Sequence, residues 1–175
     1  EDNSDAFSVP NLTFVWGEYW ERVLTQVFNY PKSAVKTSGD WLVPDSTALR
    51  IVEARKSSVC ICTNTVDTVD YLVATISGII STGACFDIYI AFHPSERPRE
   101  TRILDAVKKL VPAKINEKLK TVNSAFEGYT NCALLISQPS FVLFEAIRHD
   151  CSVILADYWD SALCKYFAKV PGVKT

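Results

Sequence analysis

Apolar runs and amphipathic stretches alternate along most of the chain. Four continuous apolar runs have the pattern of strands that are covered on both faces of a parallel sheet. They lie at residues 58–62, 87–92, 132–136 and 152–156. Between and after these runs, apolar residues recur with a period of 3.6 and predict helices. The helices are expected at residues 68–81, 98–110, 141–149 and from 161 to 167.

Strands that alternate with helices in this way predict an α/β fold, a Rossmann-like parallel sheet with helices on both faces. The first 56 residues predict short strands at 12–16 and 33–37, with helices at 18–28 and 46–56. We interpret residues 1–56 as an interdomain segment that packs on a main domain, residues 57–175. The pattern is least regular at residues 111–129, where we expect a strand near 114–118 and a short helix near 122–126.

Composition excludes several classes of protein. With 48% hydrophobic residues, 22% charged residues and a net charge of −2, the 175-residue chain has the balance of a soluble globular domain. No run of Lys or Arg is longer than two, so nucleic acid is not an expected partner. No apolar stretch approaches the roughly 20 residues of a membrane span. The acidic N-terminus is unlike a secretory signal, and the lack of Met indicates a fragment or a processed chain.

The six cysteines could form three disulfides in a secreted protein. Four of them lie inside or beside the apolar runs, where buried free thiols are the simpler interpretation. No Cys-x-x-Cys pair occurs, and Cys60 and Cys62 share one face of a strand, so we expect no metal site. Free thiols favour the cytoplasm, and a disulfide-bonded extracellular interaction domain is an alternative.

Three loops can carry a ligand site, because ligands of parallel α/β sheets bind beyond the carboxyl ends of the strands. The loop after the first apolar run contains Asn64 and Thr65, whose polar side chains could contact a ligand or only solvent. The loop after the second contains His93, and Pro94 fixes the backbone directly after it. A histidine can donate a hydrogen bond to phosphate or act as an acid near neutral pH, although a loop histidine is also a common surface residue.

The third loop, residues 137–140, joins the most apolar run to a helix. Ser140 can cap this helix or, together with Ser137, contact a phosphate at the helix N-terminus. Glu145 lies in the second helical turn. Its carboxylate can accept hydrogen bonds from sugar hydroxyls or form a salt bridge with Arg148.

The order and spacing of these motifs resemble the GT-B glycosyltransferases. Residues 89–96, which include His93-Pro94, resemble the family's His-Pro motif, and residues 135–146 with 153–155 resemble its serine motif, helix and following strand. Residues 14–20 and 38–41 resemble the stretch where those chains cross between domains. The chain looks like the C-terminal half of bacterial surface-polysaccharide enzymes of the capsular polysialyltransferase, Kdo-transferase and polyol-phosphate-polymerase types. It departs from them at Pro139, which replaces the first serine of a Ser-Ser pair, and it has no glycine-rich phosphate loop.

The resemblance implies one half of a GT-B fold and a glycosyltransferase activity. Residues 57–175 would bind a CMP- or UDP-linked sugar donor, and the sugar would pass to a surface polysaccharide or lipid-linked glycan. His93 would be the catalytic contact with the donor phosphate, Ser137 and Ser140 would hold the same phosphate, and Glu145 would bind the ribose. The pocket wall would include Asn64, Thr65, Pro94 and Tyr158.

Such an enzyme would need no metal and no cofactor, because protein donors neutralise the phosphate. The glycan acceptor and any catalytic base would belong to an N-terminal acceptor-binding half of the same enzyme. We expect a cytoplasmic location with peripheral association at the inner face of the membrane. Two alternatives remain open: a sugar-nucleotide epimerase of the same fold, and a non-catalytic flavodoxin-like ligand-binding domain in which His93 and Ser140 are only structural.

Overall fold

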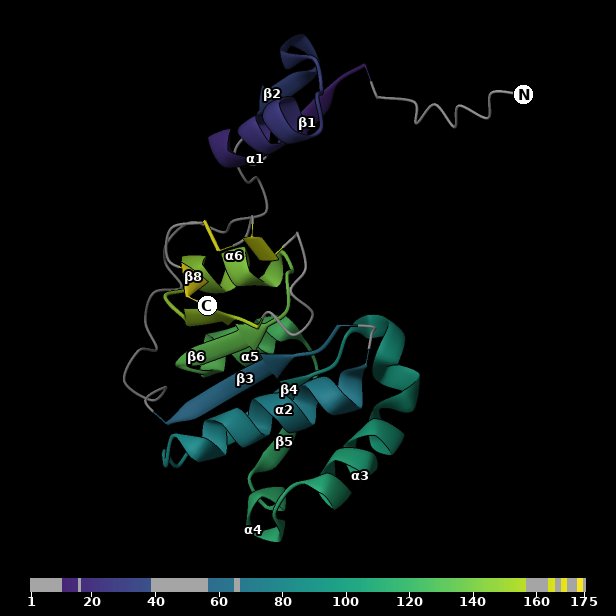
Figure 1. Ribbon diagram of the computed structural model, residues 1–175, viewed down its shortest axis with the longest axis vertical. Helices are drawn as coiled ribbons and strands as arrows, with labels where there is room; N and C mark the ends of the chain where they lie inside the picture. Colours follow the sequence, from purple (N-terminus) through teal and green to yellow (C-terminus); the bar gives the residue numbers. More distant parts are fainter. Residues whose placement is uncertain are drawn as a thin grey trace, which may run out of the picture. The chain divides into compact units, whose positions relative to one another are not determined.

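The computed structural model divides into two compact units, residues 1–46 and 47–175 (Figure 1). It describes residues 11–15, 17–38, 57–64, 67–156, 164–165, 168–169 and 173–174. The predicted boundary after residue 56 and the predicted helix at 46–56 therefore lie outside the described residues. Of the predicted last helix, Cys164 and Lys165 are described, and both are helical.

The first unit contains two short strands and one helical segment. Strand β1 (Thr13–Val15) pairs in parallel with β2 (Val35–Thr37). Helix α1 (Glu18–Arg22) continues as a π-helical turn, η1 (Val23–Val27), and a short 3-10 helix, η2 (Lys32–Ala34), precedes β2. The Thr37 hydroxyl donates to Glu21 Oε2 at 2.9 Å and so connects β2 to α1. The two predicted strands and the predicted helix are confirmed in position.

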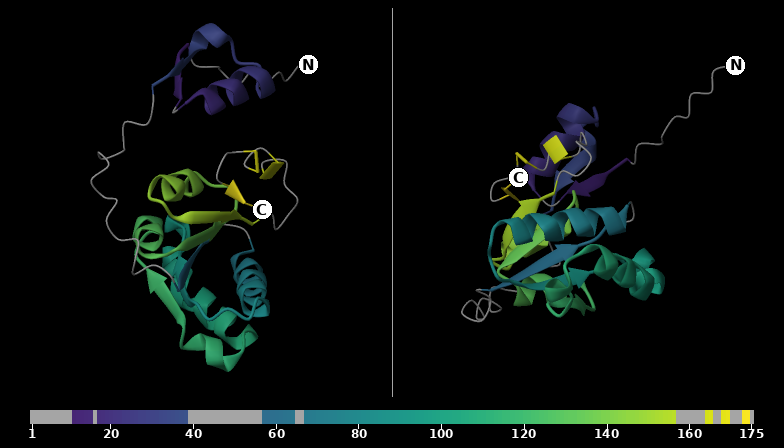
Figure 2. Two further views of the ribbon diagram at one scale, coloured as in Figure 1. Left: turned by 90° about the vertical axis from the view of Figure 1, so that its left-hand side faces the viewer. Right: turned by 60° about the horizontal axis from the view of Figure 1, so that its bottom comes forward.

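The second unit is a six-stranded parallel sheet with helices on both faces (Figures 1 and 2). The strand order is β5-β4-β3-β6-β7-β8. The strands are β3 (Ser58–Cys62), β4 (Asp87–Ala91), β5 (Leu119–Val122), β6 (Leu134–Ser137), β7 (Ser152–Leu155) and β8 (Val173–Lys174). The order reverses at β3, because the chain adds β4 and β5 on one side and then crosses to β6 on the other. This arrangement confirms the predicted Rossmann-like sheet.

The two faces of the sheet are covered by different helices. Helices α2 (Thr68–Ser81) and α3 (Glu100–Leu110) pack on one face, and α5 (Ala125–Asn131) and α6 (Val142–Arg148) on the other. Val59 and Ile61 belong to the main core cluster with α2 and α3, whereas Cys60 lies under α5. Because both faces are covered, the inner strands are apolar throughout instead of alternating.

The prediction for residues 111–129 is wrong in its positions. A short helix, α4 (Ala113–Asn116), stands where we expected a strand, β5 follows it, and α5 begins at Ala125. Strand β5 lies at the edge of the sheet and buries only Leu119 and Val122. It therefore lacks the continuous apolar run by which the inner strands are recognised. The helix expected from residue 98 likewise begins as a 3-10 helix, η5 (Pro94–Arg99), and becomes α-helical at Glu100.

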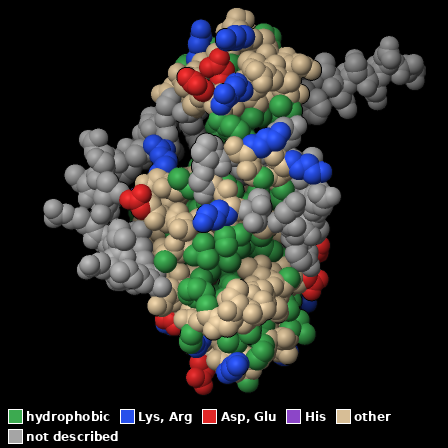
Figure 3. All heavy atoms as spheres, turned by 60° about the vertical axis from the view of Figure 1, so that its left-hand side comes forward, with side chains coloured by type: hydrophobic (Ala, Val, Ile, Leu, Met, Phe, Trp, Pro, Cys, Tyr) green, Lys and Arg blue, Asp and Glu red, His purple; other side chains and the backbone are tan. Residues whose placement is uncertain are grey.

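Several large hydrophobic residues stay exposed among those described. They are Leu12, Phe14, Val27 and Phe28 in the first unit and Leu110, Phe126 and Phe141 in the second. Hydrophobic side chains gather on one face of the second unit (Figure 3). None of the described helices combines the length and the apolar character needed to cross a bilayer.

Gly128 shows how closely α5 packs on the sheet. A Cβ atom at this position would overlap with the Sγ atom of Cys60, which is fully buried. We expect Gly128→Ala to lower the free energy of unfolding by about 1–3 kcal/mol, the usual cost of overpacking a core. Gly78→Ala in α2 is the matched control, since nothing lies within 4 Å of its Cβ position. It should raise stability by about 0.5–1 kcal/mol. Urea denaturation measures both variants, and stabilisation by both would contradict the close packing of α5.

Candidate functional site

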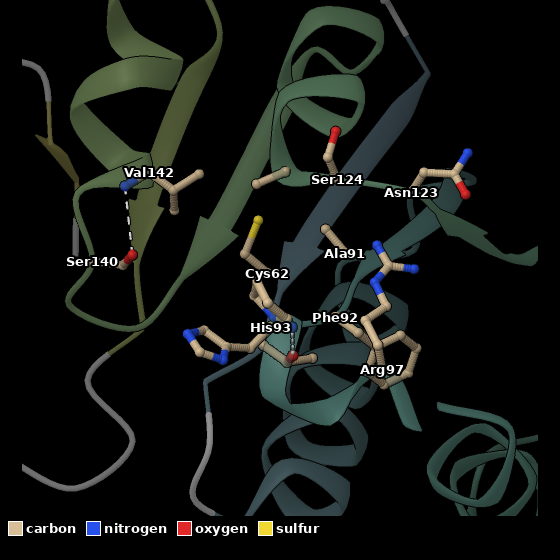
Figure 4. Close-up of a pocket in the computed structure, with 12 residues that line it drawn as sticks. Cys62, Ala91, Phe92, His93, Arg97, Asn123, Ser124, Ser140 and Val142 are labelled. Atoms are coloured by element: carbon tan, nitrogen blue, oxygen red, sulfur yellow. Dashed lines mark hydrogen bonds between the residues drawn. The ribbon is translucent and has the colours of Figure 1, made fainter. Parts of the chain in front are cut away.

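A cavity of about 410 Å³ opens at the carboxyl edge of the sheet in the second unit (Figure 4). It lies where the order of the strands reverses, so the loops that leave β4 and β6 diverge on either side of β3. The lining residues are Cys62, Thr63, Ala91, Phe92, His93, Pro94, Arg97, Asn123, Ser124, Ala125, Ser140 and Val142. Its volume falls in the range of small-ligand sites, roughly 300–1,000 Å³.

Three of the predicted site residues line this cavity. His93 and Pro94 follow β4, and Ser140 lies between β6 and α6. The Ser140 hydroxyl oxygen accepts the Val142 N–H at 3.4 Å, but the N-cap residue of α6 is Phe141 and not Ser140. The Ser140 O–H can still donate. The fold thus brings two of the predicted loops to one cavity.

The His93 side chain is held by its own loop. The Ser95 N–H donates to His93 Nδ1 at 3.3 Å, and the Ser95 hydroxyl lies 2.8 Å from the same nitrogen. A ring nitrogen that accepts a backbone N–H carries no proton, so the neutral imidazole has its proton on Nε2. The backbone is also fixed, because the His93 N–H donates to Thr63 Oγ1 at 2.9 Å. The exposed ring therefore presents an Nε2–H donor.

Sequence reasoning missed Arg97, which lines the same cavity. Its guanidinium donates to Glu100 Oε2 at 2.9 Å and to the Val122 carbonyl at 2.7 Å. A guanidinium has five N–H donors, so these two bonds leave others for a ligand. Of the described lining residues, Arg97 carries the one permanent charge, and although Glu100 pairs with it, its remaining N–H groups are suitable donors for an anion. The sequence carries no direct signal for this residue, because its place in the cavity depends on the 3-10 turn η5.

Asn123 and Ser124 form a wall that sequence reasoning also missed. Glu127 Oε2 accepts the Asn123 N–H at 2.8 Å, and Ser124 Oγ accepts the Glu127 N–H at 3.1 Å. This arrangement resembles a capping box at the start of α5, except that the carboxylate accepts the N–H of Asn123, which precedes the N-cap residue Ser124. The Ser-x-x-Glu signature at residues 124–127 is visible in the sequence and could have located both this helix and the end of β5.

The floor of the cavity is formed by the end of β3, with the Cys62 side chain in its centre (Figure 4). Behind it, the hydrogen bond with Cys132 lowers the pKa of Cys60. The hydrogen bond with Cys62 and burial outweigh this effect, so the pKa of Cys60 is raised well above the usual range of a thiol. Cys60 is therefore protonated and adds no negative charge against an anion.

Among the described residues, thiols and carboxylates are not grouped as metal ligands near the cavity. All six cysteines are among the described residues, and each is a free thiol. In the described part of the chain, no three His, Cys, Asp or Glu side chains are grouped so as to hold a metal ion.

Three of the predicted residues that the structure describes, Ser137, Asn64 and Glu145, are not among the residues that line the cavity. Ser137 ends β6 opposite Cys62 and is 3% exposed. Asn64 follows the end of β3, and its carbonyl lies 2.9 Å from the Thr68 hydroxyl, whose single proton it shares with Glu96. Thr65 and Tyr158 lie outside the described residues. Their proposed contacts with a ligand stay predictions.

Glu145 lies in the contact between α5 and α6. Its Oε2 accepts a hydrogen bond from the Tyr129 hydroxyl at 3.3 Å. Burial, and then the charge of Glu145, raise the pKa of Tyr129, so this hydroxyl keeps its proton and acts as the donor. The His149 ring lies beside Tyr129, with 5.2 Å between the ring centroids. The predicted role of Glu145 in ribose binding is not tested by these contacts.

Comparison with solved structures finds the wall teichoic acid polymerase TagF. A histidine-to-asparagine variant of TagF soaked with CDPG superimposes with a TM-score of 0.50 at 13% identity, over 94% of this chain and 46% of that chain. The same variant in another structure gives a TM-score of 0.47 at 13% identity, over 93% of this chain and 42% of that chain. No family model and no curated protein matches.

The comparison concerns the fold. The chain spans less than half the length of the TagF chains that it matches. A match of nearly all of this chain to less than half of a TagF chain is consistent with one half of a GT-B fold. At 13% identity it does not extend to the substrates or the reaction.

The contacts of His93 predict the tautomer of its ring. In the neutral form, nitrogen-15 NMR should find Nδ1 unprotonated and Nε2 protonated, because Ser95 donates to Nδ1. The chain has only two histidines, so the signals that remain in the His149→Gln variant belong to His93. Ser95→Ala, which removes one donor, should give a mixture of tautomers. A proton on Nδ1 in the unmodified protein would contradict the geometry.

Proposed function

We propose that residues 57–175 form the nucleotide-sugar-binding domain of a glycosyltransferase of the GT-B type. The observation that carries this proposal is the convergence of His93, Arg97 and Ser140 on one cavity at the carboxyl edge of a parallel sheet. An imidazole N–H, a guanidinium and a hydroxyl are suitable donors for phosphate oxygens. The motif resemblance and the fold shared with part of TagF support the glycosyltransferase class.

In this proposal, the domain acts by stabilising the leaving nucleotide. Negative charge builds on the phosphate oxygen as its bond to the anomeric carbon breaks. Arg97 would neutralise that charge through charge-assisted hydrogen bonds, and His93 would donate from Nε2. Both side chains are already held by protein contacts, Arg97 by Glu100 and His93 by Ser95. Little reorganisation is then needed when the donor binds.

The proposed donor is a CMP- or UDP-linked sugar, and the proposed acceptor is a surface polysaccharide or a lipid-linked glycan. An N-terminal half of the same enzyme would bind the acceptor and supply the group that activates it. The reaction would take place in the cytoplasm, with peripheral association at the inner face of the membrane. Ser137, Glu145, Asn64, Thr65 and Tyr158 are proposed to complete the nucleotide site.

Titration calorimetry with CMP, CDP, UDP and GDP tests this proposal. We expect one of these nucleotides to bind, and His93→Ala and Arg97→Gln each to weaken its binding by roughly 10- to 100-fold, since a hydrogen bond to a charged group contributes about 1.5–3 kcal/mol. His149→Ala is the matched control. This second histidine packs against Phe126 and Tyr129 and does not line the cavity, so its loss should leave the affinity unchanged.

Three outcomes would count against the proposal. A folded protein that binds none of the four nucleotides would favour the non-catalytic flavodoxin-like domain. Equal losses in His93→Ala and His149→Ala would indicate an effect on folding and not on the cavity. Release of a free epimerised sugar nucleotide would favour the epimerase.

A further inference from the structure

A buried carboxylate joins two loops behind the cavity. Glu96, in η5, is 1% exposed, and its two oxygens accept the hydroxyls of Thr63 and Thr68. Thr63 follows β3 and Thr68 begins α2, so the carboxylate connects the β3–α2 loop to the β4–α3 loop. Among the described residues, no cation pairs with Glu96. An apolar side chain would be less costly to bury here, so stability alone does not account for a glutamate.

The same hydrogen bonds lead directly to His93. The Thr63 hydroxyl has one proton, which it donates to Glu96, and its oxygen accepts the His93 N–H at 2.9 Å. On the other side, the Glu96 N–H donates to the His93 carbonyl at 2.8 Å. The peptide groups on both sides of the His93 Cα are therefore fixed. Without the carboxylate, the Thr63 hydroxyl would be free to rotate and to donate elsewhere.

We propose that Glu96 is a positioning residue for the cavity, which acts through Thr63 to fix the backbone and ring of His93. Glu96 also directly precedes Arg97. Because the Glu96 side chain is anchored in the interior, it fixes the backbone position from which the Arg97 side chain extends to the cavity. The effect on ligand binding rests on the proposed function, whereas the effect on His93 itself does not.

Two substitutions of Glu96 distinguish the effect of its hydrogen bonds from the effect of its side-chain volume. Glu96→Leu removes both acceptor oxygens at similar volume. Glu96→Gln keeps one acceptor for Thr63, and its amide N–H can donate to the Thr68 hydroxyl, which then donates to the Asn64 carbonyl. Histidine labelled with nitrogen-15 reports on His93 directly, because the chain has only one other histidine.

We expect Glu96→Leu to shift the ring and amide signals of His93. It should also weaken nucleotide binding about tenfold or more relative to the unmodified protein. The affinity of Glu96→Gln should stay within about threefold of the unmodified protein.

Thr68→Val removes one of the two hydroxyl donors at a residue outside the cavity lining, and it should cause a smaller shift of the His93 signals in the same direction. This variant gives an answer even if Glu96→Leu does not fold. Ile88→Val, at the opposite end of β4, controls for a general loss of stability and should leave His93 unchanged.

The outcomes distinguish this proposal from the proposed function. Unchanged His93 signals in both Glu96→Leu and Thr68→Val would overturn the positioning role, whatever the nucleotide titrations show. Shifted signals that Glu96→Gln restores would support it even if the unmodified protein binds no nucleotide. In that case the proposed function fails and the positioning role stands.

Discussion

The arrangement of the second unit depends on the central position of β3. All five of its residues are buried, and it pairs in parallel with β4 on one side and β6 on the other. Its side chains contribute to both faces, Val59 and Ile61 to the core under α2 and Cys60 to the packing under α5. A one-residue slip would exchange these two faces, so the register is strongly specified. The cavity lies at the carboxyl end of β3. The chain passes from β3 to β4 on one side and later returns to β6 on the other side, so the loops after these strands separate there.

The side chains around the cavity are fixed mainly by polar contacts, whereas the sheet beneath is fixed by apolar packing. Arg97 is held by a carboxylate and a carbonyl, and the His93 loop by hydroxyls and the buried Glu96. Such contacts are directional, so they set the orientation of donors more sharply than apolar packing does. Local placement also explains how a chain with a net charge of −2 can present several hydrogen-bond donors and a guanidinium at one cavity. The net charge of the chain does not reveal where a single guanidinium lies.

The inner strands could be predicted because helices cover both of their faces, which leaves a continuous apolar run in the sequence. Edge strand β5 leaves no such run, and its misplacement hid Asn123 and Ser124. His93, Pro94 and Ser140 could be found from their positions after predicted strands. The contact of Glu145 with Tyr129 could not, because it depends on how α5 packs beside α6. Arg97 required knowing that η5 turns its side chain toward the cavity.

The residues around the cavity are suited to binding a leaving group and not to activating an acceptor. None of the described lining residues is Asp or Glu, so the lining offers no carboxylate to take a proton from a nucleophile. His93 is also poorly placed as a base, because Ser95 occupies Nδ1 and the proton is on Nε2. These residues supply hydrogen-bond donors and a guanidinium, and under the proposed function these groups would stabilise a leaving anion. A transfer reaction also requires an activated acceptor, and under the proposed function that task falls to an N-terminal half of the enzyme.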